Sequence, residues 1–118
     1  MSTVVENPPV SPEGLQELPD QKGFELVDGE LVERKVSVLS SWIGLPLARL
    51  IGNYVDLHRL GWVFGSDNGF QCFADRPDLI RRPDFSFVRA SRMTWGEVAE
   101  GWLQVVPDLV VEVIPPGD

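Results

Sequence analysis

Alternating apolar and polar residues predict two short strands in the first third of the chain. Residues 24–27 and 30–36 alternate in this way and are joined by Asp28 and Gly29. An Asp-Gly pair favours a tight hairpin turn, because both central positions of that turn need positive φ. We therefore expect a β-hairpin over residues 24–36.

The strongest helical pattern follows this hairpin. Apolar residues recur at spacings of three and four from Leu47 to Val55, with polar residues on the opposite face. Pro46 is best accommodated in a first turn, where its missing N–H costs nothing, and Gly61 follows the pattern. The predicted helix therefore spans residues 44–59.

Strand patterns dominate the remainder of the chain. Residues 62–66 and 69–73 predict a second hairpin, residues 84–88 a strand, and residues 94–102 one or two helical turns. Residues 108–114 form a nearly continuous apolar run, which is typical of a strand buried on both faces. One convincing helix cannot cover such a sheet, so we expect further helices beyond Asp118 or from another chain.

The front of the chain has a different composition. Residues 1–22 contain four prolines among acidic and polar residues and show no regular period. We expect a flexible, acidic, proline-rich arm over residues 1–22 and a single domain over residues 23–118, because this length allows one modest core.

Composition excludes several classes of protein. Apolar residues make up 43% of the chain, enough for a folded core. One cysteine and one histidine rule out a disulfide framework and a zinc site built from several such ligands. No apolar run approaches the roughly 20 residues of a membrane span, and the first residues do not resemble a signal peptide. We expect a soluble, cytoplasmic protein with no membrane contact.

The charge is distributed unevenly. The net charge is -8, and residues 1–33 account for -7 of it with eight acidic residues and one lysine. Residues 76–92 instead hold five arginines against two aspartates. This basic segment is either a phosphate-binding element or a solvated loop of mixed charge, and its composition leaves both interpretations open.

Acidic residues within or next to the predicted strands are the candidate metal ligands. Glu112 lies within the last apolar run, where desolvation disfavours its charge, and a divalent cation with oxygen ligands would compensate it. Asp84, after Arg81 and Arg82, and Glu30, after the first turn, are the other candidates. The alternative is structural: Glu112 pairs with an arginine, Asp84 caps a strand and Glu30 solvates a turn.

Three segments carry a resemblance to a known family. They are FELVDGELVE at residues 24–33, RRPDFSFV at 81–88 and VPDLVVEVIPPGD at 106–118, with an amphipathic helix after the first. In this order they resemble the Uma-two family of restriction-endonuclease-like proteins, within the PD-(D/E)XK nuclease superfamily. The resemblance implies an α/β (α+β) fold with a restriction-endonuclease-like mixed sheet and a flanking helix, incomplete at the C-terminus.

The resemblance also implies roles for individual residues. Asp84 and Glu112 would bind Mg²⁺ or Mn²⁺, Glu30 would assist the metal or the attacking water, and Arg81 and Arg82 would hold a phosphate. The implied activity is metal-dependent endonuclease hydrolysis of phosphodiester bonds in DNA. The motif lysine expected two residues after Glu112 is replaced by Ile114, and the family resemblance implies a lysine beyond Asp118.

Rival functions are less well supported by the residues. The sole histidine, His58, ends the predicted helix rather than accompanying a nucleophilic serine, and Cys72 sits in a strand pattern typical of a small core residue. The serious alternative is a truncated, non-catalytic module that binds a partner protein or DNA. An uncovered sheet would also permit a homodimer or other self-association.

Overall fold

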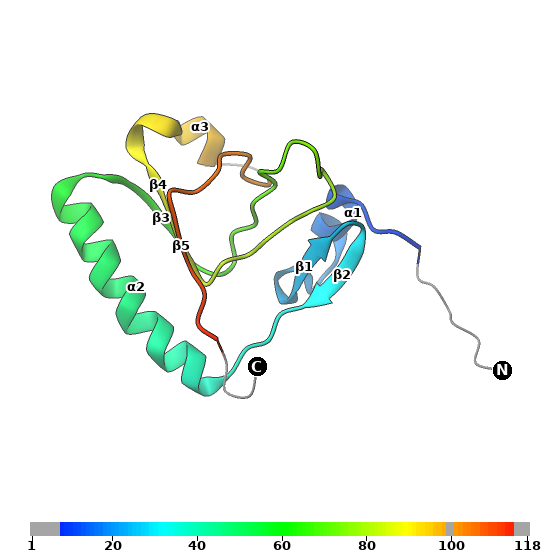
Figure 1. Cartoon of the computed structure of the whole chain (residues 1–118), viewed down its shortest axis with the longest axis horizontal. Helices are drawn as coiled ribbons and strands as arrows, with labels where there is room; N and C mark the ends of the chain where they lie inside the picture. The colour runs from blue at the N-terminus through cyan, green and yellow to red at the C-terminus, as the bar shows by residue number, and fades with distance from the viewer. Residues whose placement is uncertain (1–7, 99–100, 115–118) are drawn as a thin grey trace.

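The computed structural model describes residues 8–98 and 101–114, and within them the fold is α+β, as the sequence predicts (Figure 1). Two antiparallel sheets are present. One is the hairpin β1–β2, and the other has the strand order β3–β4–β5. Helix α2 lies beside the three-stranded sheet and contacts β3, while the hairpin lies on the other side of that sheet.

The first hairpin confirms the turn prediction. Strands β1 (Phe24–Val27) and β2 (Glu30–Glu33) pair antiparallel, and Asp28 and Gly29 between them have φ values of 50° and 87°. Leu26 is fully buried, and its backbone pairs with Ile80. The hairpin is therefore attached to the segment that leads into β4.

Helix α2 (Val38–His58) begins earlier than predicted. A capping box supplies the start: the Ser37 hydroxyl accepts from the Ser40 amide at 3.0 Å, and the Ser37 amide donates to the Ser40 hydroxyl at 3.1 Å. Pro46 consequently lies inside the helix, not in its first turn as we expected. The helix ends at Arg59, which adopts the left-handed conformation with φ 53°.

The predicted second hairpin is wrong. Strand β3 (Gly61–Phe64) pairs with β4 (Phe85–Arg89), with Trp62 opposite Val88. Phe70, which the prediction placed in the returning strand, forms isolated bridges with Arg81 and Leu103. Its ring is only 2% exposed and packs in a core cluster with Val88 and Leu103, so burial of this side chain outweighs the local turn signal.

Strand β5 (Leu109–Val111) also differs from its prediction. It pairs with β4 at the edge of the described sheet, and Leu109 and Val110 are 43% and 50% exposed. The apolar run therefore does not form a strand buried on both faces. The expected turns near residue 95 are present as α3 (Trp95–Val98), which follows the short 3-10 turn η2 (Ala90–Arg92).

Part of the expected flexible arm is folded. The short helix α1 (Pro12–Glu17) begins at Ser11, whose hydroxyl accepts from the Gly14 amide, and η1 (Gln21–Gly23) leads into β1. Leu15 is fully buried in a second cluster with Leu26 and Ile80. Leu15 thus attaches α1 to the core, and residues 1–7 lie outside the described residues.

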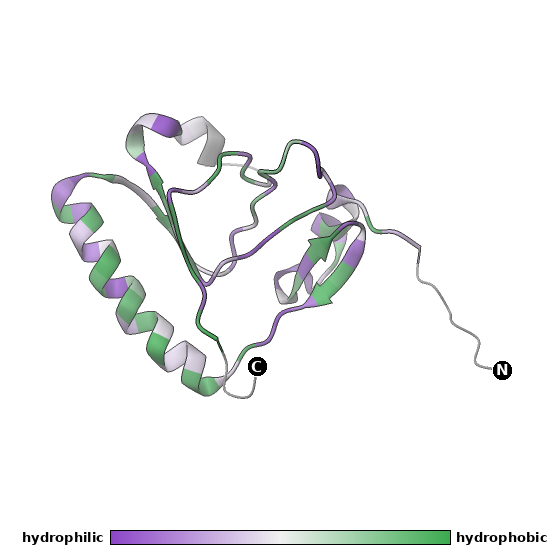
Figure 2. Ribbon diagram, in the orientation of Figure 1, coloured by the Kyte–Doolittle hydropathy of each residue, from purple (hydrophilic) through white to green (hydrophobic). Residues whose placement is uncertain are grey.

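Helix α2 keeps much of its apolar surface in contact with solvent. Figure 2 shows hydrophobic residues on successive turns along its length, yet Val55 is its one buried residue. Val38, Trp42 and Leu45 are 89%, 74% and 71% exposed. The described residues therefore cover only one side of this helix.

Candidate active site

Asp84 and Glu112 lie at the adjoining ends of two paired strands. Phe85, the first residue of β4, pairs with Val111, the last residue of β5, so Asp84 and Glu112 each stand one residue beyond the last pair of this ladder. The Val113 amide donates to Asp84 Oδ2 at 2.7 Å, which fixes the aspartate against the end of β5. The fold thus brings together the two acids that the sequence nominated as metal ligands.

Glu25 is a third acid at this site. It lies in β1, its side chain is 17% exposed, and its Oε2 accepts from the Arg82 amide at 2.6 Å. Its Oε1 lies 3.5 Å from Arg81 Nη1. The sequence pattern does not mark Glu25, because a polar residue next to an apolar one in a short strand is typical of an outward-facing position. Only the bridge between Leu26 and Ile80 brings it beside residues 81 and 82.

The pKa of the Glu112 carboxyl is affected by the nearby acids. Desolvation raises the pKa of the Glu112 carboxyl first, and the negative charges of Asp84 and Glu25 raise it further. The positive charges of Arg34 and Arg81 lower the pKa but do not cancel the rise. Negative charge at this position is therefore incompletely compensated by the protein, which is the environment that a cation would stabilise.

Arg34 is a second residue that sequence reasoning missed. Its Nη2 lies 3.6 Å from Asp84 Oδ1, and its Nη1 donates to the Lys22 carbonyl at 3.1 Å. The side chain is only 11% exposed. It follows β2 in the chain and no motif marks it, so the only available signal was its position at the end of the hairpin.

The two arginines before Asp84 have different environments. Arg82 is 2% exposed, and its guanidinium donates to the Phe24 carbonyl at 2.9 Å and to Gln21 Oε1 at 3.2 Å. It also lies over the Trp102 ring, 5.0 Å from the centroid, and burial lowers its pKa. Arg81 has a side chain that is 52% exposed. Of this pair, Arg81 is the one that presents its charge to solvent.

Glu30 lies apart from the other acids. It is exposed at the start of β2, opposite Val27 and next to the hairpin turn. Among the described residues, the charges that shift the pKa of Glu112 include those of Asp84 and Glu25 but not that of Glu30. The structure therefore brings Asp84 and Glu112 together and leaves Glu30 at the other end of the hairpin strands.

A cavity of about 690 Å³ opens beside the acids. Glu25, Arg81 and Glu112 contribute charged side chains to its wall, and most of the remaining wall is apolar, including Phe70 and Val110. A charged end joined to an apolar wall is a common form of ligand site. Asp84 lines a neighbouring cavity with Arg34, on the side of the N-terminus of α2.

The donor set fits magnesium better than a metal that needs a full protein cage. Residues 8–98 and 101–114 hold no group of three or more His, Cys, Asp or Glu side chains placed to share one ion. Two carboxylates remain, Asp84 and Glu112, and Mg²⁺ is commonly held by one or two carboxylates together with water and substrate phosphate.

The other reactive side chains have structural surroundings. The ring of His58 lies tilted against the ring of Tyr54 at a centroid distance of 4.3 Å, and Ser37 and Ser40 cap α2. Cys72 packs against the core cluster around Phe70, and burial raises the pKa of its thiol. These environments do not activate a nucleophile.

Comparison with known proteins identifies the family. The chain matches the family model Uma2, described as "Putative restriction endonuclease", over residues 12–118. The chain belongs to this family, which suggests a nuclease activity. A comparison with curated proteins found no match. In the described part of the chain, no helix is long and apolar enough to cross a membrane.

Proposed function

We propose that this chain forms the metal-binding part of an endonuclease that hydrolyses phosphodiester bonds in DNA with Mg²⁺ or Mn²⁺. The observation that supports it most strongly is the proximity of Asp84 and Glu112 at the adjoining ends of β4 and β5, in a chain that belongs to this family. Restriction-endonuclease-like proteins generally use divalent metal ions. The proposal extends this general property to two named carboxylates.

Each residue then has a distinct task. Asp84 and Glu112 hold the ion, and Arg81, exposed at the cavity, orients a DNA phosphate. We assign the assisting acid to Glu25 rather than Glu30, because Glu25 shares the cavity with Glu112. A bound divalent ion supplies an activated water and neutralises charge on the phosphate.

The absence of a lysine at position 114 lowers the rate of cleavage that we expect. Ile114 stands two residues after Glu112, and the two lysines of the chain, Lys22 and Lys35, lie far from it in sequence. Loss of one group that stabilises the transition state costs about 3 kcal/mol. We expect weak cleavage by these 118 residues, measurable at high enzyme concentration.

Titration calorimetry with Mn²⁺ tests the proposal most directly. Wild type should bind, Asp84→Asn and Glu112→Gln should each abolish the heat, and Asp56→Asn, which changes an exposed acid of α2, should not. Cleavage of supercoiled plasmid should require Mg²⁺ or Mn²⁺ and be lost in the same two variants. Equal heats for wild type and Glu112→Gln would reject the metal site.

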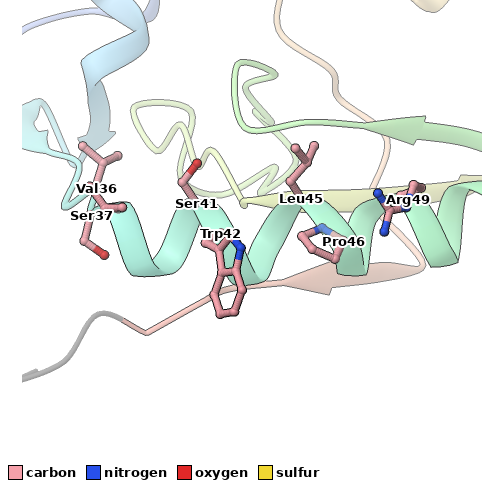
Figure 3. Close-up of a pocket in the computed structure, with 8 residues that line it drawn as sticks. Val36, Ser37, Ser41, Trp42, Leu45, Pro46 and Arg49 are labelled. Atoms are coloured by element: carbon pink, nitrogen blue, oxygen red, sulfur yellow. The ribbon is translucent and has the colours of Figure 1, made fainter.

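A second candidate function is a non-catalytic binding module. The exposed face of α2 borders a shallow cavity lined by apolar side chains, among them Trp42, Leu45 and Pro46 (Figure 3). Exposed Leu109 and Val110 on β5 add a second apolar edge, which could mediate self-association. If Trp42→Ser with Leu45→Ser removes an association with DNA, a protein or a second copy while the acidic variants do not, this function replaces the nuclease.

A further inference from the structure

We propose that Arg34 is the resident counter-ion of Asp84, and that a divalent cation binds the acidic pair only by displacing the Arg34 guanidinium. This inference rests on the proposed metal site and adds a residue that opposes metal binding. Arg34 would hold the carboxylates together in the metal-free fold and set the affinity of the ion that replaces it.

The position of Arg34 is fixed by the backbone around it. Its amide donates to the Gly23 carbonyl at 2.8 Å, and its Nη1 donates to the Lys22 carbonyl at 3.1 Å. These contacts come from the turn that precedes β1, so the Arg34 side chain is positioned by groups other than Asp84 and keeps the Lys22 carbonyl as a partner when its contact with Asp84 is lost. Since the side chain is 11% exposed, its charge is less screened than that of a surface arginine.

The contact with Asp84 is close enough to neutralise charge and loose enough to exchange. Nη2 and Oδ1 are 3.6 Å apart, beyond the 2.7–3.2 Å range typical of an N–H···O hydrogen bond. Asp84 Oδ2 is meanwhile held by the Val113 amide, so the aspartate would stay in position when the guanidinium leaves Oδ1. An incoming ion would therefore meet an oriented oxygen.

The charges at the site favour a divalent ion in this exchange. Arg81 lies against Glu25 and Arg34 against Asp84, which leaves the charge of Glu112 repelled by both acids. A monovalent cation that displaced Arg34 would only substitute one positive charge for another. A divalent ion replaces the guanidinium and also neutralises Glu112, so the gain exceeds what is lost.

Calorimetry with MnCl₂ measures directly how much Arg34 weakens the binding of Mn²⁺. Arg34→Gln should tighten Mn²⁺ binding about tenfold, because a positive charge close to the ion is removed. Arg34→Lys, which keeps the charge, should bind close to the wild-type affinity. Arg49→Gln, a change at an exposed arginine of α2, serves as the matched control and should leave the affinity unchanged. Equal affinities for wild type and Arg34→Gln would overturn the inference and leave the metal site intact.

The thermal midpoint of the metal-free protein provides an independent readout. Arg34→Gln should lower it in EDTA, and the loss should be smaller in an Asp84→Asn background, because the partner charge is already gone. If no variant binds Mn²⁺, the proposed metal site fails, and the counter-ion role is then decided by this double-mutant cycle alone: coupling supports it, and additivity overturns it. If Arg34→Gln is unfolded in EDTA, either Mn²⁺ or Asp84→Asn must restore folding, and failure of both overturns the inference.

Discussion

At the scale of single residues, the candidate site combines the negative charges of three carboxylates with the positive charges of two arginines. Glu25 and Asp84 each have an arginine partner, whereas Glu112 experiences desolvation and two like charges. A group whose carboxyl pKa is raised on folding disfavours the folded state once it ionises. Glu112 is therefore expected to cost stability in the absence of a bound cation.

Replacing Glu112 with glutamine should stabilise the metal-free protein near neutral pH. Because the folded pKa of Glu112 lies above its unfolded value, stability falls as the pH rises from the unfolded pKa through the folded one. The gain from Glu112→Gln should be below about 1 kcal/mol, since the side chain is partly exposed to solvent. Urea unfolding in EDTA between about pH 4 and pH 8 measures it. A variant that loses stability at neutral pH would contradict this account of the site.

At the scale of elements, local signals and tertiary contacts compete along α2 and around Phe70. The capping box at Ser37 and Ser40 starts the helix well before the periodic apolar stretch, and the helix continues through Pro46 although proline removes one backbone hydrogen bond. Around Phe70 the turn signal is overruled, because the ring gains more from burial than a short hairpin would provide. The start of α2 is set by contacts that satisfy backbone donors, and the position of Phe70 is set by contacts that bury apolar surface.

Removing the cap should shorten or destabilise α2. Ser37→Ala loses the side-chain acceptor of the Ser40 amide and should cost about 1 kcal/mol of unfolding free energy. Ser41→Ala, at an exposed position one turn into the same helix, should change stability by less than about 0.5 kcal/mol. Denaturant unfolding of the two variants, with helicity followed by circular dichroism, makes the comparison. Equal costs would show that the capping box does not define the start of the helix.

At the scale of the whole molecule, the front of the chain closes the core. Leu15 of α1 packs with Leu26 of the hairpin and with Ile80 from the segment before β4. The Trp102 indole N–H donates to the Pro12 carbonyl at 3.1 Å, which ties the segment before β5 to the same region. These contacts join segments that are distant in sequence, and they hold the hairpin that carries Glu25 and leads to Arg34.

Truncating Leu15 should therefore destabilise the whole domain. Leu15→Ala should cost about 3 kcal/mol, because it removes a fully buried side chain and leaves a cavity. Glu17→Ala, on the exposed side of the same short helix, should change stability by less than about 0.5 kcal/mol. Thermal unfolding of both variants distinguishes them. A small effect at Leu15 would restore the interpretation of residues 12–22 as a flexible arm.

The local patterns of the sequence determined the first hairpin, the existence of the long helix and the α+β class, and they nominated Asp84 and Glu112 as candidate acids. Asp28 and Gly29 define a turn by their own dihedral preferences, and Asp84 and Glu112 stand in segments that are each contiguous in the chain. Such features depend on residues that are adjacent in the chain, so they can be predicted without knowledge of the fold.

Tertiary structure alone decided which strands pair, which residues complete the site and which basic residues face solvent. The pairing of β3 with β4, the placement of Arg34 beside Asp84 and of Glu25 near Glu112, and the burial of Arg82 all join residues far apart in the chain. The energies that decide them come from burying apolar surface and from compensating charge in a partly desolvated site. These energies depend on which residues of other segments pack against a side chain, and the spacing of residues in the sequence does not specify those contacts.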